Sequence, residues 1–409
     1  MIARTVLSRI EEKMSYRPVT LITGARQTGK TTLCRFLSEK YGMGYVSLAN
    51  MSERRAAVKD PELFLKTHPA PLVIDEVQYA PGLFDYLEGI VDKVKFEGGK
   101  YQGMYVLAGS QEFTRMQGVS QSMAGRIGII RLSPLSQSEI AGREDIHFRV
   151  EPELNDRRAE GLHMSCDEFY NRLVRGSYPE LYNNPSVDTG DFYSDYTETY
   201  ISRDVSQIIN VKDSLKFQEF LELTASLTGQ ELVYENISNA IGIDAKTVKS
   251  WLGVLETSGI IRILRSYTSR SSVKRVIRRP KIYFCDTGLA CYLAKVVDAE
   301  TLKNGYLCGP MVETYIVNEI IKSHENNGVN TGFSYYRVQS GEIDLVMLRD
   351  GELTLVECKS GITYDAKDVK SFERMDKSLY EIGPSCIICL TEKMYVLKEN
   401  VYALPFTSI

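Results

Sequence analysis

The stretch Gly24-Ala-Arg-Gln-Thr-Gly29-Lys30-Thr31 fits the pattern G-x-x-x-x-G-K-[S/T] at every defined position. It follows an apolar run at 19–23 with the character of a strand, and it precedes a helical pattern at 30–39. Glycines in such a loop let backbone N–H groups turn inward around phosphate oxygens, and the positive end of the helix adds to the attraction. The sequence therefore predicts a phosphate-binding loop between a strand and a helix.

Nine consecutive residues of this loop are expected to contact ATP. They are Gly24, Ala25, Arg26, Gln27, Thr28, Gly29, Lys30, Thr31 and Thr32. The Lys30 ammonium would reach the β- and γ-phosphates, and the Thr31 hydroxyl would be a ligand of Mg²⁺. We therefore predict ATP with Mg²⁺ as the bound cofactors.

Two adjacent carboxylates, Asp75 and Glu76, end a second apolar strand at 71–75. Ligands of open α/β sheets bind outside the carboxyl ends of the strands, which is where these acids would lie. Asp75 is expected to hold Mg²⁺, directly or through water, and Glu76 to polarise the attacking water. Ser110 follows the strand at 104–108 and is a further candidate for contact with the γ-phosphate or the water.

The pattern of apolar and charged residues divides the whole chain into four segments. Residues 1–140 alternate short apolar strands (19–23, 44–48, 71–75 and 104–108) with helices, which indicates a parallel sheet covered on both faces. Residues 141–215 have a helical, acidic character. Residues 216–300 contain helices at 233–242 and 245–257 and a strand near 258–264, the order of a winged helix. Residues 301–409 form another α/β block, with a helix from Met311 and a helix from Ala366.

The winged-helix segment carries a strongly basic stretch at 261–281, although the formal net charge of the whole chain is −4. The stretch has no acidic residue and contains Arg262, Arg265, Arg270, Lys274, Arg275, Arg278, Arg279 and Lys281. Such a patch suits the phosphate backbone of DNA, and we predict DNA as a partner there. A wing that docks on the acidic lid at 141–215 of the same chain, or a solvated face, is the alternative.

An Asp-Gly turn is predicted at Asp350-Gly351, between strands at 342–348 and 353–359. With that turn, cross-strand partners sum to 701, so Asp344 would face Glu357 and Glu342 would face Lys359. Paired carboxylates this close repel one another unless a cation or proton lies between them.

We therefore predict a second Mg²⁺ or Mn²⁺ held by Asp344 and Glu357, with Glu313 of the preceding helix as an added ligand. Lys359 would orient or deprotonate a water. The constellation is similar to that of PD-(D/E)xK nucleases. An exposed face on which Lys359 neutralises Glu342 is the alternative.

Several motifs together resemble predicted prokaryotic ATPases of the AAA+ superfamily that carry a nuclease-like C-terminal domain of unknown function. They are the phosphate loop, Ile74-Asp-Glu-Val-Gln-Tyr-Ala-Pro81, Arg131-Leu-Ser-Pro-Leu-Ser136, Gly176-Ser-Tyr-Pro-Glu180, Tyr200-Ile-Ser-Arg-Asp204 and Pro280-Lys-Ile-Tyr-Phe-Cys-Asp-Thr-Gly288. The resemblance covers nearly the whole chain. It implies an AAA+ type parallel sheet at 1–140, a helical lid at 141–215, a winged helix at 216–300 and a restriction-endonuclease-like α/β domain at 301–409.

AAA+ enzymes also use an arginine that senses the γ-phosphate, often from a neighbouring subunit. Candidates are Arg126, Arg175 and Arg203, and we favour Arg203. Such an arginine contributes roughly 10³–10⁵ in rate, so a homo-oligomer could be needed for turnover.

Composition is consistent with a cytoplasmic protein. Charged residues make up 25% and hydrophobic residues 43% of the chain. No apolar run approaches the roughly 20 residues that cross a bilayer, and the N-terminus does not resemble a signal peptide. The Cys386-Ile-Ile-Cys389 pair lies in a predicted strand, where the two thiols would face opposite sides.

Three functional hypotheses follow. The first is an ATPase coupled to a metal-dependent nuclease that acts on DNA. The second is a regulatory ATPase whose C-terminal half only binds protein or nucleic acid. The third is a signalling NTPase of a stress or defence system.

Overall fold

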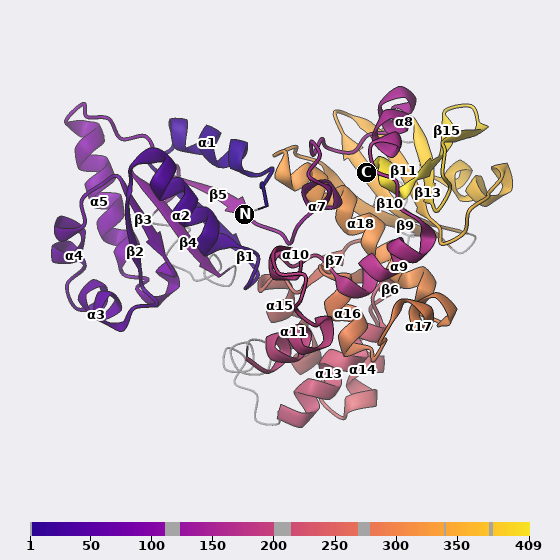
Figure 1. Cartoon of the computed structure of the whole chain (residues 1–409), viewed down its shortest axis with the longest axis horizontal. Coiled ribbons are helices and arrows are strands. Elements are labelled where there is room, and N and C mark those ends of the chain that lie inside the picture. The colour runs from indigo at the N-terminus through magenta and orange to yellow at the C-terminus, as the bar shows by residue number, and fades with distance from the viewer. Residues whose placement is uncertain (1, 111–122, 200–213, 269–278, 339–340, 376–378) are drawn as a thin grey trace. The chain divides into compact units, whose positions relative to one another are not determined.

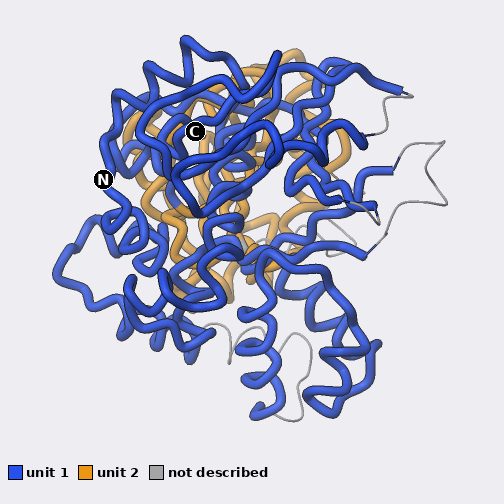
Figure 2. The backbone as a smooth tube through the Cα atoms, turned by 90° about the vertical axis from the view of Figure 1, so that its right-hand side faces the viewer, with its two compact units in different colours: residues 1–3, 135–256, 260–409 blue, residues 4–134, 257–259 orange. Residues whose placement is uncertain are grey.

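The computed structural model describes residues 2–110, 123–199, 214–268, 279–338, 341–375 and 379–409. The chain forms two compact units (Figure 2). One comprises residues 4–134 with 257–259, and the other comprises 1–3, 135–256 and 260–409. Arg203, Arg270, Lys274, Arg275 and Arg278 lie outside the described residues.

The unit of residues 4–134 is built around a parallel sheet of five strands in the order β2-β3-β4-β1-β5 (Figure 1). Its strands are β1 (Val19–Gly24), β2 (Gly44–Ser47), β3 (Leu72–Asp75), β4 (Tyr105–Ser110) and β5 (Ile127–Arg131). Its helices are α1 (Leu7–Tyr16), α2 (Lys30–Tyr41), α3 (Met51–Lys59), α4 (Pro61–Thr67) and α5 (Leu83–Phe96). The four predicted strands are confirmed, and β5 is a fifth that the sequence reading missed.

Two apolar layers pack against this sheet, one on each face. Ile10 of α1 and Leu33 of α2 belong to one buried cluster with Ile22 of β1. Phe64 of α4 and Leu87 of α5 belong to another cluster, which includes Leu21 of β1. Because neighbouring residues of a strand point to opposite faces, the alternation within β1 confirms a sheet covered on both sides.

The second unit begins with helices and ends in a mixed sheet. Its helices are α7 (Gln137–Ala141), α8 (Pro152–Glu160), α9 (Cys166–Arg175), α10 (Pro179–Asn183), α11 (Thr189–Tyr196), α13 (Ser214–Ser226), α14 (Tyr234–Ile241), α15 (Ala245–Thr257), α16 (Thr287–Leu293), α17 (Ala299–Asn304) and α18 (Cys308–Asn326). A 3-10 helix covers Ala366–Arg374. The two helices predicted for residues 233–257 correspond to α14 and α15.

Two sheets lie in this unit. A small antiparallel sheet has the order β6-β8-β7, from β6 (Gln230–Glu231), β7 (Ile261–Leu264) and β8 (Lys281–Phe284). The larger, mixed sheet has the order β14-β15-β13-β11-β10-β9, with β12 beside β11. Its strands are β9 (Gly332–Val338), β10 (Gly341–Arg349), β11 (Glu352–Cys358), β12 (Glu381–Ile382), β13 (Ser385–Cys389), β14 (Tyr395–Lys398) and β15 (Val401–Pro405).

Two buried apolar clusters lie in the unit, and the smaller one includes Ile343 of β10 and Leu355 of β11. The larger one connects the helices with the large sheet. It joins Phe169 of α9, Trp251 of α15, Ile316 of α18 and Ile388 of β13. The predicted division at residues 140, 215 and 300 stays a prediction. Among the described residues, no helix combines the length and the apolar character needed to span a bilayer.

Candidate functional sites in the two units

The phosphate loop lies between the end of β1 and the start of α2. Gly24 has φ of 152°, and Gly29, the residue before α2, has φ of 93°. A Cβ atom on Gly24 would lie 2.2 Å from the carbonyl oxygen of Leu132, so the close approach of these backbones requires glycine. The Thr28 hydroxyl donates to the carbonyl of Ala25 at 2.9 Å. The loop is therefore closed on itself and opens onto the N-terminus of the 12-residue helix α2.

Lys30 is buried, and its ammonium donates to the carbonyl oxygens of Gly24 at 2.9 Å and Ala25 at 2.7 Å. Burial lowers the pKa of Lys30 to about 8, while the nearby carboxylates of Glu76 and Asp75 oppose that shift. The cation is thus held inside the loop by carbonyl oxygens. Thr31 and Thr32, the next two residues of α2, are exposed.

Asp75 and Glu76 stand at the carboxyl edge of the same sheet. Asp75 is 1% exposed and accepts hydrogen bonds from the Tyr45 hydroxyl at 3.1 Å and from the Glu76 amide at 3.0 Å. Glu76 has φ of 58°, an uncommon value for a residue with a side chain, and its carboxylate accepts from the Gln78 amide. Ser110 pairs with Gly24 in the ladder between β4 and β1, which places its backbone at this edge.

Arg4 is a contributor that the sequence reading missed. Its guanidinium donates to the carbonyl oxygens of Thr28 at 2.8 Å and Ser133 at 2.7 Å. Arg4 therefore joins the phosphate loop to the segment that follows β5. No local motif signals this role, because the three residues are far apart in the sequence.

Gly24→Ala should disable the phosphate loop. The methyl group would meet the Leu132 carbonyl and impose an unfavourable φ, so we expect this unit to lose roughly 2–6 kcal/mol of stability. Hydrogen exchange in peptides covering the five-stranded sheet would measure the loss of stability, and calorimetric titration with a non-hydrolysable ATP analogue would measure the loss of affinity. Gly89→Ala, in open space within α5, should instead gain about 0.5–1 kcal/mol. Equal analogue affinity in Gly24→Ala and the wild type would contradict this account of the loop.

The two described arginine candidates already have partners. Arg126 contacts the carboxylates of Asp92 at 2.7 Å and Glu88 at 3.1 Å. Its carbonyl accepts from the Val19 amide, at the amino end of β1 and so opposite the phosphate loop. Arg175 donates to the carbonyl of Leu181. These contacts do not distinguish the candidates, and the choice of Arg203 stays a prediction.

The hairpin of the C-terminal domain confirms the predicted turn and register. Asp350 and Gly351 have φ of 51° and 84°, as a type I′ turn requires. Leu345 pairs with Val356 and Leu348 with Leu353, so paired residue numbers sum to the predicted value. The ladder ends at Leu345 and Val356, next to the predicted carboxylate pair.

Asp344 and Glu357 both turn into a buried cluster at this end of the hairpin. Asp344 accepts from the Cys358 amide at 2.9 Å, and Glu357 is paired with the Lys359 ammonium at 2.7 Å. The second carboxylate oxygen of Glu357 is buried without a hydrogen-bond partner. Burial, reinforced by Asp344, raises the pKa of Glu357 to about 8. The carboxylates are therefore close, as predicted from the turn.

Glu313 joins the cluster from helix α18. Its carboxylate accepts from the Tyr283 hydroxyl at 2.6 Å and from the Lys281 ammonium at 2.7 Å. Burial raises the pKa of Glu313 to about 7, and Asp344 adds to the shift. Glu313, Asp344, Glu357 and Lys359, predicted from separate segments, are thus brought to one place.

Glu342 and Lys281 require two corrections. Among the described residues Lys359 does not neutralise Glu342: the ion pairs of Glu342 are with Lys281 and with Arg337 of β9, whose guanidinium lies 3.0 Å from its carboxylate. Lys281 is not part of an exposed basic surface, because its side chain is only 4% exposed. Its ammonium contacts Glu313, Glu342 and Asp344, the last at 3.4 Å. Within the described parts of the chain, no group of three or more Asp, Glu, His or Cys side chains has the spacing of a metal site.

The basic stretch at 261–281 is only in part a free cationic surface. Arg262 is paired with Glu325 of α18 at 3.0 Å, and Lys281 with the acidic cluster. Arg265 and Arg279 are exposed. Two of its described cations therefore pair with acids of the same chain, but these acids lie on α18 and β10 and not in the segment 141–215 that the alternative named.

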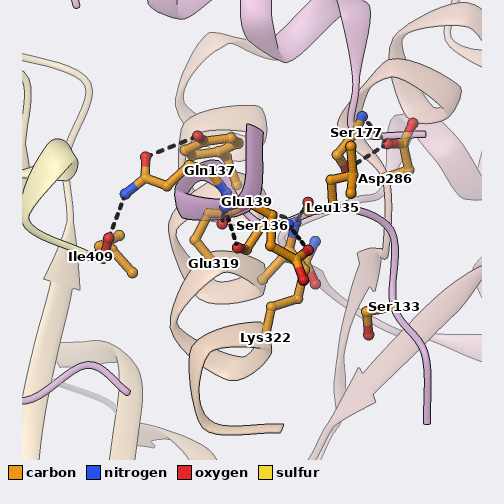
Figure 3. A network of polar contacts seen from close by, with 12 residues as sticks. Ser133, Leu135, Ser136, Gln137, Glu139, Ser177, Asp286, Glu319, Lys322 and Ile409 are labelled. Carbon is orange, nitrogen blue, oxygen red and sulfur yellow. Dashed lines mark hydrogen bonds and ion pairs between the residues drawn. The ribbon is translucent and has the colours of Figure 1, made fainter. Parts of the chain in front are cut away.

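Two of the quoted motifs hold each other in place. The Asp286 carboxylate accepts from the Ser177 amide at 2.6 Å and from the Ser177 hydroxyl at 2.9 Å (Figure 3). It also accepts from the Tyr193 hydroxyl at 2.6 Å. A Cβ on Gly176 would lie 2.0 Å from the Tyr193 oxygen, and Gly176 has φ of 75°. These motifs at 176–180 and 280–288 therefore have a structural role.

Comparison with known families finds a match for each of three consecutive segments of the chain. Residues 16–141 match the model described as an AAA domain, and they contain the phosphate loop with Asp75 and Glu76. The chain therefore carries an AAA-type ATPase domain. It is followed by matches to two domains of unknown function, DUF8612 at 166–300 and DUF4143 at 308–409.

Similar proteins include Uncharacterized protein Rv2008c of Mycobacterium tuberculosis, which is 23% identical over 99% of this chain and 84% of its own length. Uncharacterized protein Mb2031c of Mycobacterium bovis matches to the same extent. Among solved structures, the Walker-type ATPase PABY2304 of Pyrococcus abyssi shares 14% identity over 72% of this chain and 96% of its own, with a TM-score of 0.38. The RuvB Holliday junction branch migration motor of Thermotoga maritima shares 15% over 65% and 93%, with a TM-score of 0.31.

Proposed function

We propose that the protein is a Mg²⁺-dependent ATP hydrolase in which ATP binds across the carboxyl edge of the five-stranded sheet. The observation that carries this proposal is the buried Lys30 ammonium inside a loop closed by Gly24, with the buried carboxylate of Asp75 at the same edge. When bound, Mg²⁺ supplies charge that neutralises the phosphates. Thr31 and Asp75 would hold it, and Lys30 would exchange its carbonyl partners for phosphate oxygens.

Glu76 is the proposed base that orients the attacking water. Its backbone conformation is strained, and strained residues persist where the surrounding structure imposes them, commonly at functional sites. Ser110, at the end of β4, and Arg203 are proposed to approach the γ-phosphate. Arg203 would act from a neighbouring copy, so the proposal includes a homo-oligomer.

Glu76→Gln should keep ATP bound and stop its turnover. The amide retains the size of the side chain but cannot accept a proton, so we expect a loss of about 10²–10⁴ in turnover with little change in affinity. Steady-state phosphate release and calorimetric ATP titration would separate the two effects. Unchanged turnover in this variant would remove Glu76 from the mechanism, whereas absent turnover in the wild type with Mg²⁺ would count against hydrolysis itself.

For the C-terminal domain we propose a nuclease-like site that acts on DNA. The proposal is supported by the convergence of Asp344, Glu357 and Glu313 beside Lys359, and by the unpartnered oxygen of Glu357. A second Mg²⁺ or Mn²⁺ would be held by the three carboxylates. Lys359 would orient the water, and the exposed Arg265 and Arg279 would contact the phosphate backbone.

Asp344→Ala and Lys359→Ala should each abolish metal-dependent DNA cleavage while leaving ATP turnover intact. Labelled single- and double-stranded DNA, incubated with Mn²⁺ or Mg²⁺ with and without ATP, would report the activity. Lys393→Ala, an exposed lysine of the same domain, serves as the control. Intact DNA with the wild-type protein under all these conditions would refute the nuclease proposal and leave the ATPase proposal standing.

A second candidate is a regulatory ATPase whose C-terminal half is a non-catalytic module. Lys281 favours it, because one ammonium already contacts three carboxylates of the cluster. In this arrangement the cluster is a buried ion-pair network, and the domain would bind a protein or nucleic acid through other surfaces. Metal-independent DNA binding without cleavage would support this candidate.

A further inference from the structure

Lys281 reaches the acidic cluster from outside the sheet that carries it. It is the first residue of β8, and it pairs with Glu231 of β6 and Leu264 of β7 in the small sheet. Its ammonium also lies 5.6 Å from the centre of the Tyr335 ring, on β9. The position of this cation is therefore set by the small sheet and the edge of the large one, not by the hairpin.

Of the four carboxylates in this region, Glu313 and Asp344 depend most on Lys281 for a neutralising charge. Glu342 also contacts Arg337, and Glu357 contacts Lys359. Glu313 and Asp344, by contrast, form ion pairs among the described residues with Lys281 only. Without this ammonium, two carboxyl groups would lose their ion-pair partner, beside a Glu357 oxygen that has no partner and belongs to a residue 8% exposed. Carboxylate oxygens are the ligands that a hard divalent cation prefers, although the three side chains do not have the spacing of a metal site while Lys281 lies among them.

We propose that the Lys281 ammonium is a built-in cation that excludes a divalent metal ion from the cluster of Glu313, Asp344 and Glu357. The inference rests on the proposal that these residues form a cation site, and it adds the regulation of that site. While the Lys281 ammonium contacts these carboxylates, the site is closed to a metal ion. A lysine in this role occupies the space between the carboxylates and neutralises their negative charge, as a bound metal ion would otherwise do.

Metal binding can be measured without reference to cleavage. The electron paramagnetic resonance signal of free Mn²⁺ would be titrated with full-length protein in the absence of nucleotide. We expect Lys281→Ala to gain one Mn²⁺ site, with affinity at least about tenfold higher than any site of the wild type, because the carboxylates lose their resident cation. Adding Asp344→Asn to Lys281→Ala should abolish the gained site, which assigns it to the cluster.

Arg262→Ala is the matched control, because it removes a paired cation of the neighbouring strand β7 but leaves a single carboxylate, Glu325. It should gain no Mn²⁺ site. Because Lys281→Ala leaves buried acids without an ion-pair partner, which opposes folding, Lys281→Ala with Glu313→Gln provides a second, less charged variant. It should also gain a site, whereas Glu313→Gln alone should not.

The outcomes separate this inference from the proposed function. If the wild type and Lys281→Ala bind Mn²⁺ equally well through Asp344, Lys281 excludes nothing and the inference is wrong, although the metal site survives. If neither Lys281→Ala nor the double variant gains a site, both the inference and the metal site are wrong. A gained site in a protein that leaves DNA intact would uphold the inference and refute only the nuclease proposal.

Discussion

Lys30→Met should lower ATP turnover by about 10²–10³, the loss seen when one preorganised donor to developing charge is removed. The wild-type ammonium lies inside the loop and donates to two carbonyl oxygens, those of Gly24 and Ala25. It is therefore positioned before any ligand arrives. Methionine keeps the length and apolar stem of the side chain but removes the charge and the donors.

The measurement is steady-state phosphate release with Mg²⁺-ATP, together with calorimetric titration of a non-hydrolysable analogue. Burial lowers the pKa of Lys30 to about 8. Bound phosphates would favour the charged form, so binding should be accompanied by proton uptake above pH 8 in the wild type and not in Lys30→Met. Calorimetry in two buffers of different ionisation enthalpy detects that uptake.

Lys40→Met is the matched control, because Lys40 lies on the same helix and is paired with Glu11 on the surface. Its loss should change turnover by less than about twofold, since exposed pairs contribute little. Comparable losses in Lys30→Met and Lys40→Met would mean that the helix, and not the loop ammonium, determines turnover.

Local patterns predicted the elements that carry the phosphate site. The loop motif, the apolar strands and the adjacent acids lie within short windows, so strand β1, helix α2 and the edge position of Asp75 followed from them. Strand β5 was missed, although its Ile-Gly-Ile-Ile run is apolar, because no recognised motif marked it. Arg4 was missed because its partners at 28 and 133 meet it only after the sheet has formed.

The C-terminal site also shows that contacts within a short stretch of sequence can be predicted, whereas contacts between distant segments cannot. The Asp-Gly turn sets the hairpin register, so the proximity of Asp344 and Glu357 could be worked out by counting residues. The contact of Lys281 with these carboxylates could not be predicted in this way, because Lys281 lies in a different sheet. In the sequence it stands among other basic residues and was interpreted together with them. The density of basic residues along the chain therefore predicted a DNA-binding surface. In the fold, however, two of these cations, Lys281 and Arg262, form ion pairs with acids of the same chain.

Lys322→Met should destabilise the packing of α18 against α7 by about 3–5 kcal/mol, because it leaves a buried carboxylate unpaired. The Lys322 ammonium contacts Glu319 at 2.5 Å and donates to the Leu135 carbonyl at 2.8 Å (Figure 3). Both side chains are less than 5% exposed. The other Glu319 oxygen accepts from the backbone N–H of Gln137 at 2.8 Å. The ion pair therefore contacts the backbone at the start of α7 twice, at Leu135 through Lys322 and at Gln137 through Glu319.

Because the chain folds as two units, global unfolding is not a single transition, and local hydrogen exchange is the appropriate measurement. A loss of 3 kcal/mol corresponds to about a hundredfold faster exchange. We expect that acceleration in peptides covering 135–145 and 308–326, with little change in those covering the five-stranded sheet. Lys303→Met, which removes an exposed lysine paired with Asp167, should leave all peptides within about 0.5 kcal/mol of the wild type.

The double variant Lys322→Met with Glu319→Gln separates the charge from the packing. Glutamine still offers an oxygen to the Gln137 amide but carries no buried charge, so the double variant should be more stable than Lys322→Met alone by more than 1 kcal/mol. If the double variant is less stable than the wild type by the sum of the two single-variant losses, the two side chains act independently. The ion pair would then not be what fastens α7, the first helix after residue 134, to α18, the helix that also carries Glu313.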